Sequence, residues 1–347
     1  MPYSRTTLSK FIIEDQRRSG ATQPDLSSLL NDIQTACKLI SLAVSRGVLD
    51  KSAAGGSGGS RLDGIADAIM RETCEWGGQL RGMASRRQYE PYKIPPPYPR
   101  GRCLLVFDPL EGADNIDVNV PVGTLFSVLR CPDGVAEPAT ADFLQPGTEQ
   151  VAAGYAIYGP VAMIVLTLGA GVHGFTLDRD IGAYTLTHPD MQIPAATHEC
   201  AINSANQRLW PAPVRRYVEE CIEGSAGPRG EDFSLRWIAC SVSEVHRILL
   251  RGGLLIDPPG ESDGLRLLHV ANPMAMLVDQ AGGAASTGHE PILGIQPKAM
   301  DQMIPVILGS RDEVERLIAY HVEHERGEEP AFTTPLFNVR SLFTRAG

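Results

Sequence analysis

The sequence lacks the features that mark several classes of protein. Its 347 residues contain no run of about 18 apolar residues, the length that a membrane-spanning helix requires. The first ten residues carry two cations but no apolar core followed by a small-residue cleavage site, so we expect no signal peptide. Lys and Arg nowhere form a dense cluster, and the net charge is −10, which disfavours nucleic-acid binding through a basic face. We therefore expect a soluble protein whose partners are neither membranes nor nucleic acids.

Cysteine spacing excludes two further kinds of site. The seven cysteines are odd in number, and no two of them have the Cys-x-x-Cys spacing of zinc ribbons and redox motifs. Structural disulfides are also rare in reducing compartments. We expect reduced thiols in a cytoplasmic protein.

Hydrophobic periodicity predicts helices near the N-terminus and strands after them. Residues 25–48 and 61–76 have apolar side chains at helical spacing, and the glycine-rich run 53–60 between them is typical of a mobile loop. Strand-like runs then occur at residues 103–107, 124–129, 153–158, 162–168 and 174–177. From about His198 helices alternate with strands, which indicates a layered α/β fold.

Residues 108–117 form the segment best suited to chemistry. They follow the apolar run 103–107, and acidic side chains at the carboxyl end of a buried strand suit a hard cation such as magnesium. Gly112 would let backbone amides approach an anion. A solvated acidic turn has the same composition, so the pattern alone leaves both interpretations open.

This segment, Asp-Pro-Leu-Glu-Gly-Ala-Asp-Asn-Ile-Asp, resembles the Asp-Pro-Leu-Asp-Gly-Ser-Ser-Asn-Ile-Asp signature of class I fructose-1,6-bisphosphatases. That family belongs to the magnesium-dependent, lithium-sensitive phosphatase superfamily. Further motifs match in the same order, among them residues 152–159, Asn-Pro-Met-Ala at 272–275 and residues 305–310. The resemblance covers nearly the whole chain.

The resemblance implies the fold, the domains and the assembly. The family fold is an α/β/α/β/α sandwich. We expect an N-terminal domain at residues 1–195, a C-terminal α/β domain at 196–330 and a tail at 331–347. The resemblance also implies a homo-oligomer, either a tetramer or a dimer.

The resemblance further implies a metal-assisted phosphoryl transfer. Carboxylates of the family hold magnesium ions, and an activated water attacks the sugar 1-phosphate. The matching catalytic residues here are Asp67, Asp108 and Glu111. Asp108, Glu111 and the carbonyl of Leu110 are the matching metal ligands.

The phosphate-binding turn is altered in the present sequence. Gly112, Ala113 and Asp114 stand where the family has Gly-Ser-Ser, whose amides hold the phosphoryl oxygens. A carboxylate beside a phosphate is repelled by about 4 kcal/mol per charge pair at 4 Å and an effective dielectric constant of 20. Asp114 therefore weakens the expected phosphate site unless its side chain points away.

Other ligand positions of the family carry residues that cannot bind a metal. A Glu-Glu pair before the signature strand corresponds to Arg86 and Arg87, and a glutamate before Asn-Pro-Met-Ala corresponds to Val270. We expect one of the arginines to replace a metal ion by pairing with Asp108 or Glu111, because a guanidinium is permanently charged and can bind a carboxylate through two N–H groups. Alternatively, both arginines lie on an exposed proline-rich loop and contact only water.

The family's second phosphate site is also altered. The resemblance places a lysine at Gly264, and tyrosines at Trp237 and Asp257. Besides the turn, the predicted substrate-binding residues are Asn203, Arg236, Trp237, Asp257 and Arg266. In the family, the arginine at Arg236 reaches across from a neighbouring subunit.

These replacements lead us to expect that magnesium-dependent hydrolysis of the 1-phosphate is lost or much reduced. The protein would then act on another small molecule, for which an anion is a candidate, or serve a non-catalytic binding role. One alternative is an active phosphoric monoester hydrolase that converts fructose 1,6-bisphosphate to fructose 6-phosphate with Mg²⁺. A purely structural partner subunit is a third interpretation, and neither it nor a binding role requires a cofactor.

Overall fold

The structure is a computed structural model that describes residues 5–19, 24–47, 58–259 and 264–328. The expected tail at 331–347 and residues 53–57 of the glycine-rich run lie outside this part of the chain. In the described part, no helix is long and apolar enough to cross a membrane.

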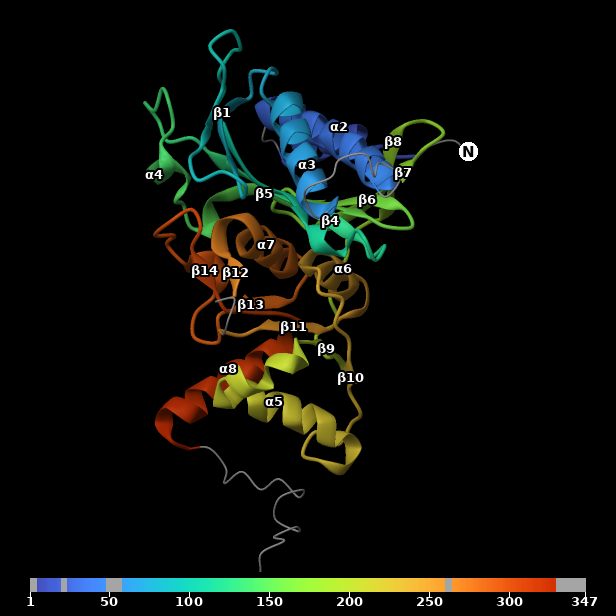
Figure 1. Cartoon of the computed structure of the whole chain (residues 1–347), viewed down its shortest axis with the longest axis vertical. Helices are drawn as coiled ribbons and strands as arrows, with labels where there is room; N and C mark the ends of the chain where they lie inside the picture. Colours follow the sequence, from blue (N-terminus) through green and yellow to red (C-terminus); the bar gives the residue numbers. More distant parts are fainter. Residues whose placement is uncertain (1–4, 20–23, 48–57, 260–263, 329–347) are drawn as a thin grey trace, which may run out of the picture.

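Five layers are stacked along the long axis of the molecule (Figure 1). A layer of helices is followed by a large sheet, a pair of helices, a smaller sheet and a second pair of helices. This is the α/β/α/β/α arrangement that the sequence predicts, and the prediction is confirmed.

The first layer consists of helices α1 (Leu8–Ser19), α2 (Pro24–Gly47) and α3 (Gly58–Cys74). Their apolar faces pack on the large sheet, because side chains three or four positions apart lie on one side of a helix. Leu29, Ile33 and Ile40 of α2 are buried in this way. α3 begins at Gly58 and not at residue 61, so Gly58 to Ser60 extend the helix and are not part of a loop.

The large sheet has the strand order β2-β1-β3-β4-β5-β6-β7-β8. Its strands are β1 (Leu80–Ser85), β2 (Tyr92–Lys93), β3 (Cys103–Glu111), β4 (Val122–Arg130), β5 (Gln150–Tyr158), β6 (Ala162–Thr167), β7 (Val172–Asp178) and β8 (Ala183–His188). β1 and β3 are parallel, and the other neighbouring strands are antiparallel. The proline-rich segment at residues 89–100 supplies only the short edge strand β2, a position at which prolines are tolerated.

β3 continues four residues beyond Phe107, where the sequence pattern ends it. Asp108 lies opposite Leu125 of β4, and Glu111 lies opposite Gly123 after an irregularity in the pairing. Asp108 and Glu111 therefore belong to the strand and do not follow it. Irregular pairing of this kind redirects side chains at the end of a strand.

The middle and lower layers contain the C-terminal elements. Helices α6 (Ser241–Arg251) and α7 (Asn272–Gln280) lie between the two sheets (Figure 1). The smaller sheet has the order β10-β9-β11-β15-β13, and α5 (Ala212–Glu223) and α8 (Arg311–Arg326) cover its outer face. Its strands are β9 (Glu199–Ala201), β10 (Ser234–Leu235), β11 (Leu254–Asp257), β13 (Ala284–Ser286) and β15 (Val306–Gly309).

Shorter elements connect these layers. They are α4 (Thr140–Phe143), the strand pair β12 (Leu265–Arg266) and β14 (Met303–Ile304), the π-helical turn η5 (Leu267–Ala271), and the 3-10 turns η1 (Ala113–Asn115), η2 (Gly147–Glu149), η3 (Ser204–Leu209), η4 (Gly224–Ala226) and η6 (Ile292–Gly294). Of these, η1, β12 and η5 carry residues of the site described below.

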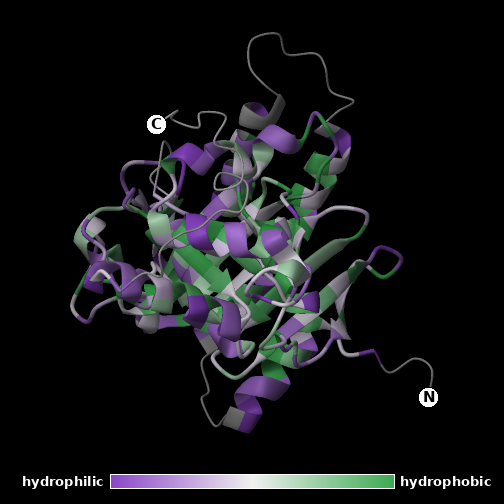
Figure 2. Cartoon of the chain, turned by 90° about the horizontal axis from the view of Figure 1, so that it is seen from below, coloured by the Kyte–Doolittle hydropathy of each residue, from purple (hydrophilic) through white to green (hydrophobic). Residues whose placement is uncertain are grey.

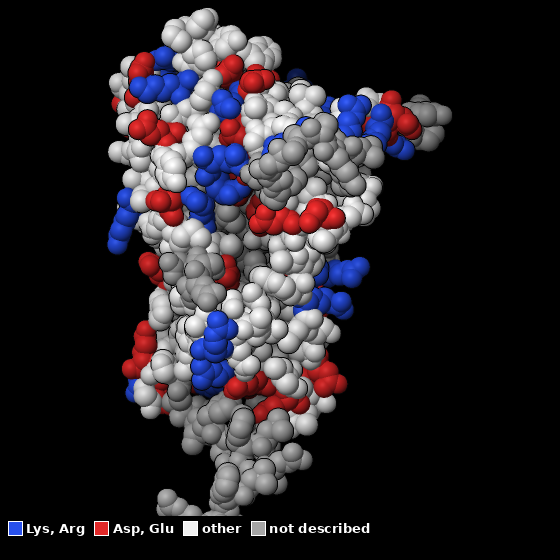
Figure 3. All heavy atoms as spheres, viewed as in Figure 1, with Lys and Arg blue, Asp and Glu red and all other residues white. Residues whose placement is uncertain are grey.

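Hydrophobic side chains fill the spaces between the layers, and the strands at the centre are largely hydrophobic (Figure 2). Phe107 and Phe126 are fully buried on neighbouring strands of the large sheet. All seven cysteines are described as free thiols, six of them buried. On the face shown in Figure 3, positively and negatively charged side chains are interspersed.

Candidate active site

A cleft of about 560 Å³ lies where the end of β3 meets the start of α6 and the β12–β14 pair. Its lining residues include Asp63, Arg86, Asp108, Leu110, Glu111, Gly112, Ala113, Asp114, Gly264, Arg266 and Val270. Segments that are far apart in the sequence thus bring most of the predicted site residues to one place.

Arg86 and Asp108 form an ion pair inside this cleft. Nε of Arg86 lies 2.8 Å from Oδ2 of Asp108 without pointing at it, so the contact is not a hydrogen bond. Nη2 of Arg86 donates to Oδ2 of Asp63 at 3.0 Å. Burial raises the pKa of Asp108 to about 6 and outweighs the opposing effect of the guanidinium. Burial by itself would lower the pKa of Arg86, but the charges of Asp108 and Asp63 raise it overall.

The sheet explains why Arg86 is in position. It follows the last residue of β1, and its backbone N–H donates to the carbonyl of Phe107 at 3.0 Å, which continues the pairing with β3. The contact expected between an arginine and Asp108 is therefore made. Arg87, by contrast, pairs with Asp63 at 2.5 Å and not with Asp108 or Glu111.

Helix α3 contributes Asp63 to the cleft in place of Asp67. Oδ1 of Asp67 accepts a hydrogen bond from the Ser85 hydroxyl at 2.5 Å, and Oδ2 accepts one from Nε of Arg71 at 2.9 Å. Asp67 is not among the described residues that line the cleft, and its catalytic role stays a prediction. Sequence reasoning missed Asp63, although the spacing of four residues from Asp67 places both carboxylates on the same face of a helix.

Glu111 faces helix α6. Its Oε1 accepts from the backbone N–H of Ser241 at 3.0 Å, and its Oε2 accepts from that of Val242 at 3.1 Å. The thiol of Cys240 also donates to Oε2 at 3.0 Å. The first amides of a helix have no partner within the helix and attract negative charge. The expected metal-ligand role of Glu111 does not fit this arrangement, because its longer side chain carries the carboxylate to the helix.

The turn after Glu111 requires glycine. Gly112 has a φ of 75°, and a Cβ atom at this position would lie 2.9 Å from Sγ of Cys240. Ala113 and Asp114 continue into η1, which Asn115 ties to the segment before α6 through a hydrogen bond from Nδ2 to the carbonyl of Ala239 at 2.9 Å. The backbone of this turn is therefore held against the cleft.

The opposite wall contains Arg266 and Val270. Within the described part of the chain, the guanidinium of Arg266 makes no hydrogen bond or ion pair, and it lines the cleft. Val270 lies in η5, is 4% exposed and offers no oxygen to a cation. Arg266 is thus the cation of the cleft that is most available to an anion.

Of the positions expected at the second phosphate, Gly264 lines the cleft, whereas Asn203, Arg236, Trp237 and Asp257 are not among its described lining residues. Asn203 caps η3 by accepting from the N–H of Ala205, and Nε of Arg236 pairs with Glu199 at 2.6 Å. Trp237 is 45% exposed, and burial raises the pKa of Asp257 to about 6. Because Arg236 is expected to act in a neighbouring subunit, its role stays a prediction.

The described residues do not fit a magnesium ion in this arrangement. Among them, no three Asp, Glu, His or Cys side chains converge as a metal site would require. Asp108 is paired with Arg86, and the carboxylate of Glu111 is occupied by the amides of α6. The family resemblance implies magnesium, but we derive no catalytic step through it.

Comparisons with known proteins indicate the same family for both halves of the chain. Residues 6–189 match the family model "Fructose-1-6-bisphosphatase, N-terminal domain", and residues 193–322 match "Fructose-1-6-bisphosphatase, C-terminal domain". The chain is 52% identical to fructose-1,6-bisphosphatase class 1 of Methylacidiphilum infernorum (isolate V4), with 99% of each chain covered. It is 50% identical to the enzyme of that name from Hydrogenophilus thermoluteolus, with 97% of each covered.

A solved structure of a protein with the same name has a similar fold. The crystal structure of Leishmania major fructose-1,6-bisphosphatase in holo form has a TM-score of 0.83 and 32% sequence identity, and it covers 92% of this chain and 99% of that one. The relatives contradict the expectation that the family reaction is lost or much reduced, because two proteins half identical to this chain over nearly their full length bear the name of the active enzyme. From its two domain matches and these relatives, the chain belongs to the fructose-1,6-bisphosphatase family.

Proposed function

We propose that this protein hydrolyses fructose 1,6-bisphosphate to fructose 6-phosphate and inorganic phosphate, as a phosphoric monoester hydrolase. The observation that carries the proposal is the identity of 52% and 50% to two proteins named fructose-1,6-bisphosphatase class 1. The cleft supports it, because the predicted site residues from β3, η1 and β12 surround one space of about 560 Å³. That volume is within the usual range for small-molecule sites.

We assign phosphate binding to Arg266 and to the turn at Gly112. The guanidinium of Arg266, which has no partner among the described residues, can bind two phosphate oxygens through parallel N–H groups. Gly112 brings the backbone close to the cleft where a side chain would collide with Cys240. Substrate binding through Gly112, Ala113, Asp114 and Arg266 is thus part of the proposal.

We assign an electrostatic role to Arg86. A free Asp108 carboxylate would repel a phosphate dianion, whereas an ion pair with a guanidinium presents little net charge. Arg86 supplies at Asp108 the positive charge that the resemblance attributes to a metal ion. The assay therefore varies the magnesium concentration. The family resemblance implies this ion, whereas Asp108 and Glu111 already have partners within the protein.

The proposal is tested by measuring phosphate release and fructose 6-phosphate formation from fructose 1,6-bisphosphate, across a titration of magnesium that includes its removal with a chelator. We expect Arg266→Gln to lower kcat/KM at least about tenfold, because hydrogen bonds between charged groups are among the strongest. Arg251→Gln, at an exposed arginine in the last turn of α6, is the matched control and should leave kcat/KM unchanged. Absence of phosphate release at every magnesium concentration would overturn the proposal.

We further infer a cytoplasmic homo-oligomer, a tetramer or a dimer, with domains at 1–195 and 196–330. The two domain matches, which end at residue 189 and begin at residue 193, support the boundary. Light scattering on the purified chain tests the assembly, and a monomer at micromolar concentration would contradict it.

A further inference from the structure

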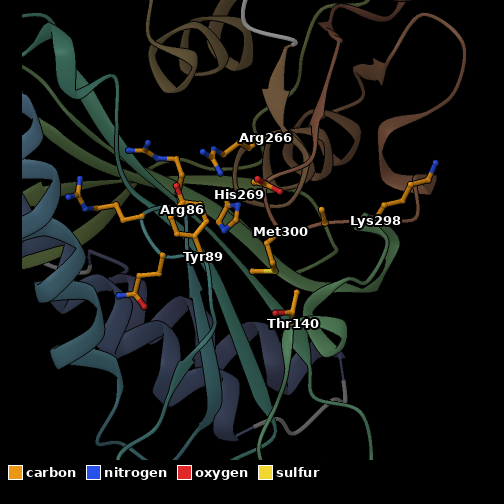
Figure 4. Close-up of a pocket in the computed structure, with 11 residues that line it drawn as sticks. Arg86, Tyr89, Thr140, Arg266, His269, Lys298 and Met300 are labelled. Atoms are coloured by element: carbon orange, nitrogen blue, oxygen red, sulfur yellow. The ribbon is translucent and has the colours of Figure 1, made fainter.

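A second cavity of about 350 Å³ opens beside the catalytic cleft (Figure 4). The two spaces share Arg86 and Arg266 in their walls. The loop after β1, the start of α4, η5 and residues 298–301 form the rest of the lining. The family resemblance and the proposed reaction give roles to the shared Arg86 and Arg266, but neither assigns a role to the remaining residues of this cavity.

The cavity has a positive lining. Its positively charged residues are Arg86, Arg87, Arg266 and Lys298, and its negatively charged residue is Asp301. Arg86 and Arg87 are already compensated by Asp63 and Asp108. Arg266 has no such partner in the described part of the chain, and Lys298 lies on the far rim with its side chain directed away from the centre (Figure 4). The remaining charge favours an anion.

His269 lies at the inner wall of the cavity without a partner. His269 is only 1% exposed, and neither Nδ1 nor Nε2 of its ring has a hydrogen-bond partner among the described residues. A buried polar group left unpaired costs free energy, so such groups in native proteins almost always meet a partner. Burial lowers the pKa of His269 to about 3, so the neutral ring offers one N–H donor and one acceptor.

We propose that this second cavity binds a phosphate group, held by the guanidinium of Arg266 and by the ring N–H of His269. A phosphate has several acceptor oxygens and a negative charge, which match a free guanidinium and a buried N–H. The hydroxyl-bearing residues Tyr89 and Thr140 in the lining can donate to further oxygens. The phosphate belongs either to the far end of the bisphosphate or to a separate molecule, including the inorganic phosphate that the proposed reaction releases.

Isothermal titration of the whole chain with inorganic phosphate tests the site without any turnover. His269→Phe keeps a ring of similar size and removes both nitrogens, and we expect it to weaken phosphate binding at least about tenfold. Because the imidazole has no hydrogen-bond partner among the described residues, the melting temperature of His269→Phe without phosphate should equal or exceed that of the wild type. Unchanged phosphate affinity, or a lower melting temperature without phosphate, would overturn the proposal.

A second variant keeps the test independent of the buried ring. Lys298→Gln should weaken phosphate binding about two- to threefold through the lost positive charge at the rim. Lys93→Gln is the matched control, since Lys93 is exposed, lies outside the cavity and carries the same charge. Equal affinities of these two variants for phosphate would count against the site.

Kinetics with fructose 1,6-bisphosphate then separate the two sources of the phosphate. A raised KM in both His269→Phe and Lys298→Gln places the far phosphate of the substrate in the cavity. An unchanged KM with lost binding of inorganic phosphate assigns the cavity to a separate molecule. Both results support the phosphate site. The proposal of this site also holds if the wild type does not hydrolyse fructose 1,6-bisphosphate, because calorimetry measures phosphate binding without turnover.

Discussion

Arg86 lies 2.8 Å from Asp108 at the point where β1 and β3 run side by side. Parallel strands place residues of equal register next to each other, so the side chain that follows β1 meets the side chain near the end of β3. The contact joins a cation and a carboxylate at two positions where the family resemblance implies metal ligands.

We predict that Arg86 and Val270 together prevent strong magnesium binding. The double substitution Arg86→Glu with Val270→Glu should bind magnesium measurably more tightly by calorimetry than the wild type, because it restores two carboxylates and frees Asp108. Neither single substitution should suffice.

The matched control for this experiment is Arg87→Glu with Val270→Glu. Arg87 pairs with Asp63 and not with Asp108, so this change leaves the ion pair of Asp108 intact. Equally tight magnesium binding by the wild type and by the Arg86 double variant would contradict the prediction. Melting temperatures identify any variant in which the buried Val270→Glu substitution has unfolded the chain.

We predict that Glu111→Gln lowers the free energy of unfolding by about 1–2 kcal/mol. Gln keeps one acceptor oxygen but loses the negative charge that faces the first amides of α6. Urea denaturation measures the change. Asp114→Asn removes a charge from the same cleft without touching those amides and should change stability by less than about 0.5 kcal/mol. Equal effects of the two substitutions would refute the capping role.

We predict that Asp257→Asn stabilises the protein at neutral pH and not at acidic pH. Burial raises the pKa of Asp257 from 3.8 to about 6. A carboxyl with a raised pKa holds its proton more tightly in the folded state, so its contribution to stability is present below about pH 4 and is lost as pH rises to about 6. The gain from Asp257→Asn, relative to the wild type, should therefore grow by up to about 3 kcal/mol between pH 4 and pH 7.

Urea titrations at several pH values measure this gain. Asp133→Asn, at an exposed loop residue, removes the same charge and serves as the control. A gain from Asp257→Asn that does not vary with pH would show that the carboxyl does not carry the effect.

We predict that Glu313→Ala destabilises the C-terminal layers by about 3–5 kcal/mol. Both carboxylate oxygens of Glu313 accept hydrogen bonds from Nη2 of Arg229, at 2.6 and 2.7 Å, and the Tyr217 hydroxyl donates to Oε2 at 2.7 Å. Removing one partner of a buried ion pair leaves the other charge uncompensated. Glu315→Ala, at an exposed position of the same helix, is the control. A loss below about 1 kcal/mol in urea denaturation would show that Arg229 finds another partner.

The replaced ligand positions did not predict the function correctly. Val270, Gly264 and the arginines at 86 and 87 led to the expectation of a lost reaction, and the relatives contradict it. A substitution shows that one ligand is missing, but it does not show what the surrounding side chains supply in its place.

The amino-acid sequence by itself determined the elements and their layers. Apolar spacing along α2 and the apolar run that begins β3 depend on local periodicity, which does not require knowledge of distant partners. The ordered motifs from residue 108 to 310 carried the family resemblance, and the resemblance implied the fold; each motif is contiguous in the chain and can be found without the structure. The motif order placed Arg86 and Arg87 near Asp108 and Glu111 but left open whether either arginine pairs with a carboxylate, and the structure forms the pair between Arg86 and Asp108.

Only the tertiary structure decided where each carboxylate points. Glu111 reaches the amides of α6, 130 residues further along the chain, and Asp63 enters the cleft while Asp67 is held by Ser85. The unpartnered His269 likewise becomes visible only when η5 packs beside the loop after β1. Such contacts depend on the direction of side chains at the ends of elements and on partners far away in sequence, and neither is encoded in local spacing.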